Sequence, residues 1–312
     1  MSDWWCEHAW LGGDTVADGV TVSVDDGAIV AVRPDSPPTG TVLHGLVIPG
    51  LANAHSHAFH RALRSRTQRD RGSFWTWRTL MYAVAQRLTP DTYRALARAV
   101  YAEMALAGIT AVGEFHYLHH DGAGRRYADP NAMGHALIDA ATAAGLRLTL
   151  LDTCYLSSGI DGAGLEDGPQ RRFGDGDADR WAQRVDALRA PESVTIGAAI
   201  HSVRAVPADQ MGTVADWVAM CGTEAAVAHA ATFPSRRAEY GPMLADLLKA
   251  PEGAYDRELV LIGQGSNVPG TNDVYRPLAE TLARAVLAGG RPRTCVWIGP
   301  PTMRDRRPRF AE

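Results

Sequence analysis

Pro49-Gly50-Leu51-Ala52-Asn53-Ala54-His55-Ser56-His57 combines a turn, a short strand and two histidines at alternate positions. Side chains at positions i and i+2 of a strand point to the same face. The imidazoles of His55 and His57 can therefore reach one metal ion, and Zn²⁺ takes such ligands at about 2.0–2.1 Å. A bare His-x-His would favour two exposed polar histidines, but the preceding turn and strand favour a metal site.

The residues on both sides of this segment predict an α/β fold. Upstream, residues 14–35 alternate around Asp25-Asp26-Gly27, which is typical of a β-hairpin, and residues 43–48 form a further strand. Downstream, strands alternate with helices, which indicates βα units around a parallel sheet. Residues 157–179, rich in Gly, Asp and Ser, are expected to form a long loop near a site. Helices are expected at 74–87, 91–107, 131–144, 178–189, 239–250 and 277–288, and strands at 109–112, 146–151, 194–200, 259–262 and 295–298.

The composition of the chain narrows the classes of function. It has 312 residues, 46% of them hydrophobic, and a formal net charge of −4 from 31 basic and 35 acidic residues. This balance argues against nucleic acid or a membrane surface as a partner. The four cysteines form no C-x-x-C pair, and neither a signal peptide nor a membrane-length apolar run is visible. A cytoplasmic protein with reduced thiols is expected.

Several motifs, in order, resemble one enzyme family. The Pro49–His57 run is similar to the first-strand signature of the amidohydrolase superfamily, and residues 1 to about 218 resemble its formimidoylglutamate deiminase family. The resemblance implies a (β/α)8 barrel with a small N-terminal β-sandwich and one or two divalent metals, zinc being the expected ion. It rests on His57-Ala58-Phe59, Ser73–Arg78, Leu80-Met81-Tyr82, Glu114–Asp121, Tyr127–Pro130, Gln170–Phe173 and Ile200–Val206.

The resemblance also implies roles for single residues. His55 and His57 would bind the metal, whose activated water would attack the formimino carbon of N-formimino-L-glutamate and release ammonia. This substrate is a dicarboxylate, and arginine forks suit carboxylates. His60 stands where the family has glutamine, so one substrate contact is expected to differ. The substrate-binding positions of the family correspond to His60, Arg78, Tyr117, His201 and Arg204, and the candidate catalytic histidines are His201 and His229.

Alternative interpretations remain for some of these residues. Arg204 follows a predicted strand, where a functional role is favoured over a solvated surface arginine. Arg78 follows Trp75-x-Trp77, so packing on an indole is as plausible as substrate binding. Trp75 and Trp77 are themselves expected in the core. His116, His119 and His120 resemble a metal cluster, but a loop that shapes the pocket is preferred, because the family does not use them as ligands.

The resemblance ends near residue 218. The family's next metal-binding histidine, a proton-moving glutamate, a further histidine and a late aspartate have no matching runs, and His229 is the only histidine after His201. Residues 259–262, 271–275 and 296–301 instead resemble the middle of an SGNH-type esterase, whose nucleophile block is absent. The expected organisation is a β unit at 1–50, the front of an amidohydrolase barrel at 51–218, and a divergent α/β segment at 219–312.

Two further interpretations stay open. The chain could be another amidohydrolase deaminase, or a non-catalytic truncated or chimeric remnant. An incomplete barrel leaves an open sheet edge with exposed apolar surface, so a homodimer or poor solubility is expected of the isolated chain.

Overall fold

The computed structural model describes residues 1–12, 14–67, 74–159, 161–165, 168–202 and 204–221, and three short strands at 226–228, 262–264 and 296–298. The chain divides into two compact units, Met1–Leu51 and Ala52–Glu312, each of which is described by itself. The predicted boundary between 218 and 219 stays a prediction. No helix within the described ranges is both long and apolar enough to cross a membrane.

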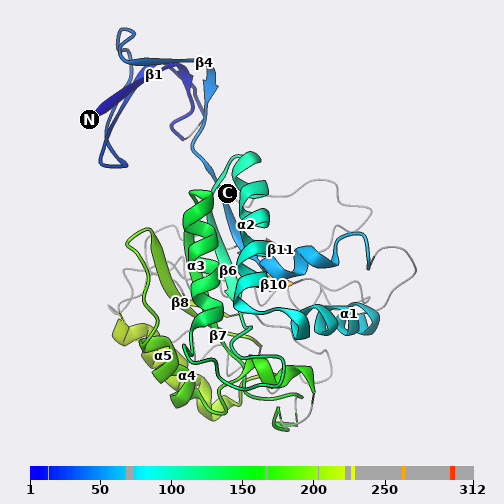
Figure 1. Ribbon diagram of the computed structural model, residues 1–312. Helices are drawn as coiled ribbons and strands as arrows, with labels where there is room; N and C mark the ends of the chain where they lie inside the picture. The colour runs from blue at the N-terminus through cyan, green and yellow to red at the C-terminus, as the bar shows by residue number, and fades with distance from the viewer. Residues whose placement is uncertain are drawn as a thin grey trace. The chain divides into compact units, whose positions relative to one another are not determined.

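The N-terminal unit is a four-stranded sheet in the order β3-β2-β1-β4 (Figure 1). Its hairpin is confirmed: β2 and β3 pair antiparallel around Asp26 and Gly27, which have φ of 46° and 77°. Two successive positive φ values give the turn a twist that matches the twist of the strands. A small core of Cys6, Ala9 and Val20 lies on one face. The strands are β1 (Ser2–Ala9), β2 (Ala17–Asp25), β3 (Ala28–Arg33) and β4 (Thr41–Val47).

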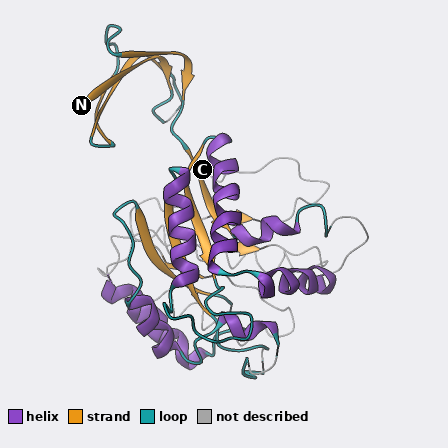
Figure 2. Ribbon diagram, in the orientation of Figure 1, coloured by secondary structure: helices purple, strands orange, loops and turns teal. Residues whose placement is uncertain are grey.

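The second unit is built on a five-stranded sheet in the order β5-β6-β7-β8-β9 (Figure 2). Successive pairs from β6 to β9 are parallel, which confirms the predicted α/β fold with a parallel sheet. Among the described residues the five strands form an open row. The strands are β5 (Leu51–Ser56), β6 (Ile109–His116), β7 (Arg147–Cys154), β8 (Val194–Ile200) and β9 (Ala226–Ala228).

Within the described ranges, five α-helices and two 3-10 turns connect and cover these strands. Thr89 begins α2 with a capping box, and Gly145 ends α3 with φ of 70°, as a hydroxyl N-cap and a C-terminal glycine favour. The packing of α2 on α3, α3 on β7 and α5 on β8 covers the sheet. The elements are η1 (Ala58–Leu63), α1 (Phe74–Arg87), α2 (Pro90–Leu106), α3 (Ala132–Ala144), η2 (Pro169–Phe173), α4 (Ala178–Asp186) and α5 (Ala208–Cys221).

Residues in the last third are described only in part. The strands β10 (Ile262–Gln264) and β11 (Val296–Ile298) pair parallel to each other. The second agrees with the predicted strand at 295–298, whereas the first begins where the predicted strand at 259–262 ends. The helices predicted at 239–250 and 277–288 lie outside the described residues.

The register of the parallel strands separates two faces of the sheet. Phe115 lies beside Leu151, and His116 lies beside Asp152. Neighbouring residues in parallel strands point the same way and successive residues alternate. His116 also faces α3, because a Cβ on Gly134 would lie 3.6 Å from its Nε2. One face therefore carries Phe115, and the helix-covered face carries His116 and Asp152.

Candidate active site

The two histidines of the opening motif lie close together on the face that carries Phe115. The ring centroids of His55 and His57 are 4.6 Å apart at an interplanar angle of 85°, and Phe115 lies 6.2 and 5.2 Å from them. Two imidazoles that share a tetrahedral ion at about 2.0–2.1 Å have centroids about 5 Å apart. The observed separation therefore fits two ligands of one cation.

Hydrogen bonding and burial prepare these rings for that role. Nδ1 of His57 donates to the carbonyl oxygen of Phe115 at 3.2 Å, because a carbonyl can only accept. This bond places the ring proton on Nδ1 and the lone pair on Nε2, the arrangement of a metal-binding imidazole held by a backbone carbonyl. Burial lowers the pKa of His55, which favours the neutral ring that a metal requires.

Three further predicted residues gather around the same place. Nε2 of His60 and the hydroxyl of Tyr117 are 3.0 Å apart, and the ring of His60 lies 4.5 Å from that of His57. His201, directly after β8, lies 5.9 Å from Phe115 and 5.3 Å from Tyr117 by ring centroids. The structure thus brings His60, Tyr117 and His201 together with the His55–His57 pair.

Both predicted arginines contact neutral partners. Arg78 donates from Nε to the Tyr82 hydroxyl at 2.8 Å, and its guanidinium carbon lies 5.5 Å from the ring of Trp75. Arg204 donates from Nη1 to the carbonyl oxygen of Ser158 at 2.6 Å. Within the described part of the chain, neither guanidinium has a carboxylate within ion-pair distance. Their charges are therefore available to an anionic ligand.

The interpretation of Arg78 as a packing residue is also supported in part, since its guanidinium stacks on Trp75 as well as hydrogen-bonding. The expectation that both tryptophans lie in the core is wrong for Trp75, whose exposed fraction is 62%. Trp77 is half-buried and packs against the main core. The exposed Trp75 indole covers one face of the Arg78 guanidinium, and the N–H groups in the plane of the guanidinium stay available to a ligand.

Two residues without a predicted role connect the arginines. Nη2 of Arg78 donates to Oε1 of Gln170 at 3.3 Å, and Nε2 of Gln170 donates to the Tyr155 hydroxyl at 2.5 Å. The same hydroxyl accepts from Nη2 of Arg204 at 2.8 Å. The ring of Tyr155 lies 4.3 Å from that of His201. The sequence signal for Gln170 was its place in the Gln170–Phe173 motif, which carried no role.

The Tyr82 hydroxyl lies in the electric field of both arginines. Burial raises the pKa of the Tyr82 phenol, and the nearby Tyr155 adds to this effect. Arg78 and Arg204 both act in the opposite direction, because each cation favours a phenolate. Both guanidinium groups therefore lie near one hydroxyl.

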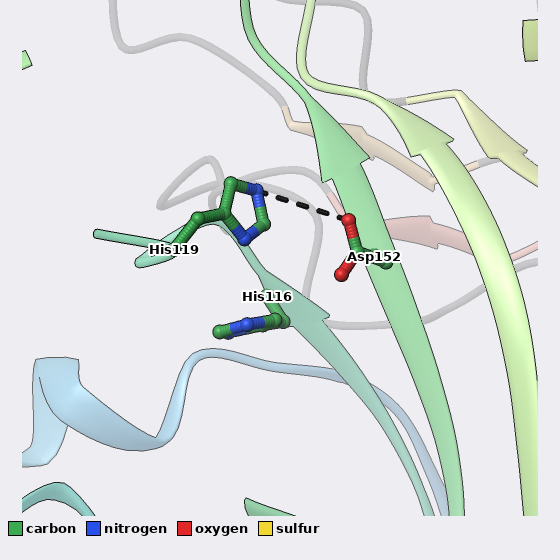
Figure 3. A group of neighbouring side chains, drawn as sticks. All are labelled: His116, His119 and Asp152. Carbon is green, nitrogen blue, oxygen red and sulfur yellow. Dashed lines mark ion pairs between the residues drawn. The ribbon is translucent and has the colours of Figure 1, made fainter. Parts of the chain in front are cut away.

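The other histidine cluster lies on the helix-covered face. His116, His119 and Asp152 offer ligand atoms within 4.8 Å of one another (Figure 3). Asp152 already accepts from Trp181 at 2.9 Å and from both terminal nitrogens of Arg184 at 2.8 and 2.9 Å. A cation here would displace or face a buried guanidinium, which is unfavourable.

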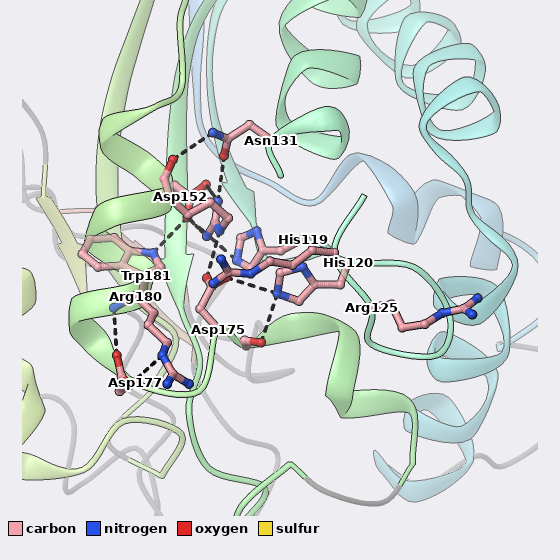
Figure 4. A network of polar contacts seen from close by, with 12 residues as sticks. His119, His120, Arg125, Asn131, Asp152, Asp175, Asp177, Arg180 and Trp181 are labelled. Carbon is pink, nitrogen blue, oxygen red and sulfur yellow. Dashed lines mark hydrogen bonds and ion pairs between the residues drawn. The ribbon is translucent and has the colours of Figure 1, made fainter. Parts of the chain in front are cut away.

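This cluster continues into a buried ionic network (Figure 4). Asp175 accepts from Nε of Arg184 at 2.8 Å, and Nε2 of His120 lies 3.2 Å from it. Arg184 and Asn131 also bond each other at 3.1 Å, which ties α4 to the start of α3. The expectation that His116, His119 and His120 shape the pocket is therefore corrected, because His116 faces α3 and the other two lie against the buried carboxylates Asp152 and Asp175. His229 and the residues that resemble an esterase at 271–275 lie outside the described residues.

The sequence of the chain is similar to those of two bacterial deaminating enzymes. Formimidoylglutamate deiminase of Pseudomonas aeruginosa is 43% identical over 196 residues, which are 61% of this chain and 43% of that protein. The 8-oxoguanine deaminase of the same organism is 29% identical over 111 residues, 36% of this chain and 24% of that protein. The chain thus spans less than half the length of these curated relatives.

Solved structures show the same fold. An amidohydrolase from Brucella melitensis has a TM-score of 0.75 at 28% identity, covering 95% of this chain and 70% of that one. A mutant atrazine chlorohydrolase TrzN from Arthrobacter aurescens TC1, complexed with zinc and atraton, has a TM-score of 0.68 at 21% identity, covering 95% and 71%. The second likeness is one of fold alone. The model of the amidohydrolase family matches residues 46–234, more than half of the 312 residues, and the chain therefore belongs to that family.

Proposed function

We propose that this chain forms the metal- and substrate-binding front of a formimidoylglutamate deiminase, which hydrolyses N-formimino-L-glutamate to N-formyl-L-glutamate and ammonia. One observation carries the proposal. Arg78 and Arg204 are joined through Gln170 and Tyr155, and the ring of Tyr155 lies 4.3 Å from that of His201, one of the rings around Phe115. A pair of cations beside a candidate metal site suits a substrate with two carboxylates.

His55 and His57 would hold the divalent cation, with zinc as the expected ion. A cation bound there would supply an activated water at neutral pH. The chain's own part is to keep Nε2 of His57 deprotonated through the Nδ1 bond to Phe115, and to keep His55 neutral by burial. A complete site needs a third protein donor, and His229 is the remaining histidine that could provide it.

The substrate would be bound by the arginines and oriented by the aromatic and imidazole groups. The guanidinium groups of Arg78 and Arg204 would each donate hydrogen bonds to one carboxylate. His201, against Tyr155 and Tyr117, would face the formimino end and hold it near the metal ligands. His60, bonded to Tyr117, would provide the polar contact made by glutamine elsewhere in the family.

The competing interpretations predict different ligands. A related deaminase that acts on a purine would have no use for two guanidinium groups with neutral partners. A non-catalytic remnant would bind neither metal nor diacid tightly. The predicted homodimer stays a prediction, to be checked by the oligomeric state in solution.

Zinc titration of the full chain tests the metal site. One equivalent of tightly bound Zn²⁺ is expected for the wild type, and a loss of at least about tenfold in affinity for His57→Ala, because one of few ligands is removed. His135→Ala is the matched control, since His135 bonds Asp129 at 2.7 Å on α3, away from the histidines around Phe115. Equal zinc binding by all three proteins would refute the assignment of His57.

Ammonia release tests the reaction. The zinc-loaded chain is expected to release ammonia slowly from N-formimino-L-glutamate, because the family's proton-moving glutamate and late aspartate have no matching runs here, and to release none from 8-oxoguanine. Stoichiometric zinc without ammonia release at high protein concentration would refute the deiminase proposal. Release from 8-oxoguanine instead would favour the related deaminase.

A further inference from the structure

A chain of hydrogen bonds through Gln170 and Tyr155, here called the Gln170–Tyr155 bridge, connects the two arginines of the proposed substrate site. It consists of three hydrogen bonds, from Arg78 to Gln170 at 3.3 Å, from Gln170 to Tyr155 at 2.5 Å, and from Arg204 to Tyr155 at 2.8 Å. Gln170 thus holds Arg78, Tyr155 holds Arg204, and the two neutral groups are hydrogen-bonded to each other.

We infer that the Gln170–Tyr155 bridge sets the separation of the Arg78 and Arg204 guanidinium groups, and so selects the length of the dicarboxylate that the site accepts. This inference rests on the proposed function. It assigns Gln170 and Tyr155 as positioning residues, because they act through the arginines.

Burial makes the bridge rigid. The exposed fraction is 9% for Gln170 and 2% for Tyr155, whereas both arginines are half-buried. Tyr155 packs its ring 5.4 Å from Phe173, so its hydroxyl cannot move without repacking the core. Buried, close-packed side chains keep single rotamers. The positions of the Arg78 and Arg204 guanidinium groups, which are bonded to them, are therefore fixed as well.

A second connection closes the arrangement around Arg204. The carbonyl oxygen of Ser158 accepts from Nη1 of Arg204 at 2.6 Å and from Nε2 of Gln170 at 3.4 Å. The segment after β7 therefore supplies both partners of Arg204, and Gln170 of η2 bonds the same two oxygens. This is the physical reason to place length selection in Tyr155, Ser158 and Gln170, which follow β7, rather than in the strands.

The neutral character of the bridge matters as much as its rigidity. A carboxylate at position 170 would hold Arg78 equally well but would neutralise its charge. An amide and a phenol hold both guanidinium groups while leaving their positive charge to an incoming anion. The buried arginine of the network behind the sheet, Arg184, is instead paired with carboxylates and is unsuited to bind a ligand.

Binding selectivity tests the inference. Affinities of N-formyl-L-glutamate and of N-formyl-L-aspartate, one methylene shorter, would be measured by isothermal titration calorimetry on the full chain. The wild type is expected to prefer the longer ligand by about tenfold. Gln170→Leu keeps the side-chain size but breaks two of the three bonds, and the preference is expected to fall about three- to tenfold, the worth of one or two neutral hydrogen bonds.

The ratio of the two affinities distinguishes a positioning role of Gln170 from a general effect on the stability of the fold. A variant that only loosens the fold weakens both ligands alike and leaves the ratio unchanged. The matched control is Gln210→Leu, in which the lost partner is the Ala178 N–H at the start of α4. Its ratio is expected to equal that of the wild type.

Tyr155→Phe is the second variant, in case Gln170→Leu does not fold. It keeps the ring against His201 and removes the hydroxyl that both Gln170 and Arg204 use. The same fall in ratio is expected.

The outcomes separate this inference from the proposed function. An unchanged ratio in both variants overturns the inference and leaves the deiminase proposal standing. A wild type that binds neither ligand overturns the inference directly. Length-selective binding that depends on the bridge, without ammonia release from N-formimino-L-glutamate, supports the inference and refutes the proposed reaction.

Discussion

Asp152 and Arg184 form a two-pronged ion pair inside the molecule, with Nη1 to Oδ2 at 2.9 Å and Nη2 to Oδ1 at 2.8 Å. Both side chains are at most 1% exposed. The pair joins β7 to α4 on the helix-covered face of the sheet. Burial acts against the charge of each partner, but each charge offsets the penalty of the other, so the pKa of Asp152 is held far below its usual value.

Removing the arginine should therefore be costly. Arg184→Met leaves Asp152 and Asp175 as buried carboxylates without their main partner, and the free energy of unfolding is expected to fall by about 3–5 kcal/mol. Urea unfolding followed by tryptophan fluorescence measures this, because Trp181 bonds Asp152. Arg94→Met is the control: its pair with Asp91 is exposed, and a change of less than about 1 kcal/mol is expected. Equal losses would contradict a stabilising role for the buried pair.

Acid should unfold the protein partly through His119. Burial, aided by the charge of Arg184, lowers the pKa of His119 to about 4 from its usual 6.5. The folded state thus resists a proton that the unfolded chain takes up, so this stability is present above pH 6.5 and is lost as the pH falls toward 4. The loss is at most about 3.5 kcal/mol at about 1.4 kcal/mol per pKa unit.

His119→Gln should flatten that part of the stability profile. Nε2 of His119 donates to the carbonyl oxygen of Thr153 at 3.0 Å, and a glutamine amide can donate there without titrating. Urea unfolding at several values between pH 6.5 and 4 measures the slope. His44→Gln, at a side chain that is 83% exposed, is expected to keep the wild-type slope. An unchanged slope in His119→Gln would contradict the prediction.

Glu114 should have the opposite pH dependence. Its fully buried carboxyl accepts from the Ala58 N–H at 2.6 Å, directly after the metal-binding motif, and burial raises its pKa to about 7 from 4.5. The folded state holds a proton that the unfolded chain releases, so its contribution is full below pH 4.5 and is lost as the pH rises to 7.

Glu114→Gln should remove this loss. The wild type is expected to lose up to about 3.5 kcal/mol of unfolding free energy between pH 4.5 and 8 from this group, whereas the variant, which cannot ionise, keeps it. Chemical denaturation at pH 5 and pH 8 gives the comparison. Glu192→Gln, at an exposed position, should follow the wild type. A variant that loses as much stability as the wild type would show that Glu114 does not titrate in this range.

Gly174 should not tolerate a side chain. A Cβ there would collide with the carbonyl oxygen of Tyr155 and lie 2.5 Å from Cδ1 of Leu165, and backbone cannot yield as a flexible side chain can. Gly174→Ala is expected to lower the melting temperature, with a cost of about 1–3 kcal/mol. Gly212→Ala is the matched control: a Cβ meets nothing within 4 Å in α5, so it should gain about 0.5–1 kcal/mol. A Gly174→Ala protein as stable as the wild type would show that the segment before α4 adapts.

Local signals account for the parts of the fold that the sequence predicted well. Thr89 begins a helix because its side chain accepts a hydrogen bond from a backbone N–H of the first turn, and Gly145 ends one because glycine adopts a positive φ without strain. Both effects act within one helical turn. The two histidines of the opening motif share a face because strand alternation is also local. The family resemblance predicted the roles of His60, Tyr117, His201 and both arginines. That these side chains lie close together could be seen only in the folded structure.

The sequence by itself determined the alternation of strands and helices and the pairing of His55 with His57, because both follow from backbone periodicity over a few residues. Only the tertiary structure decided that His116 faces α3 while His119 and His120 lie against the buried carboxylates Asp152 and Asp175, and that Gln170 reaches Arg78 across 92 positions of the chain. The physical reason is that such contacts depend on how the strands are stacked in register, which brings residues together that no local pattern relates.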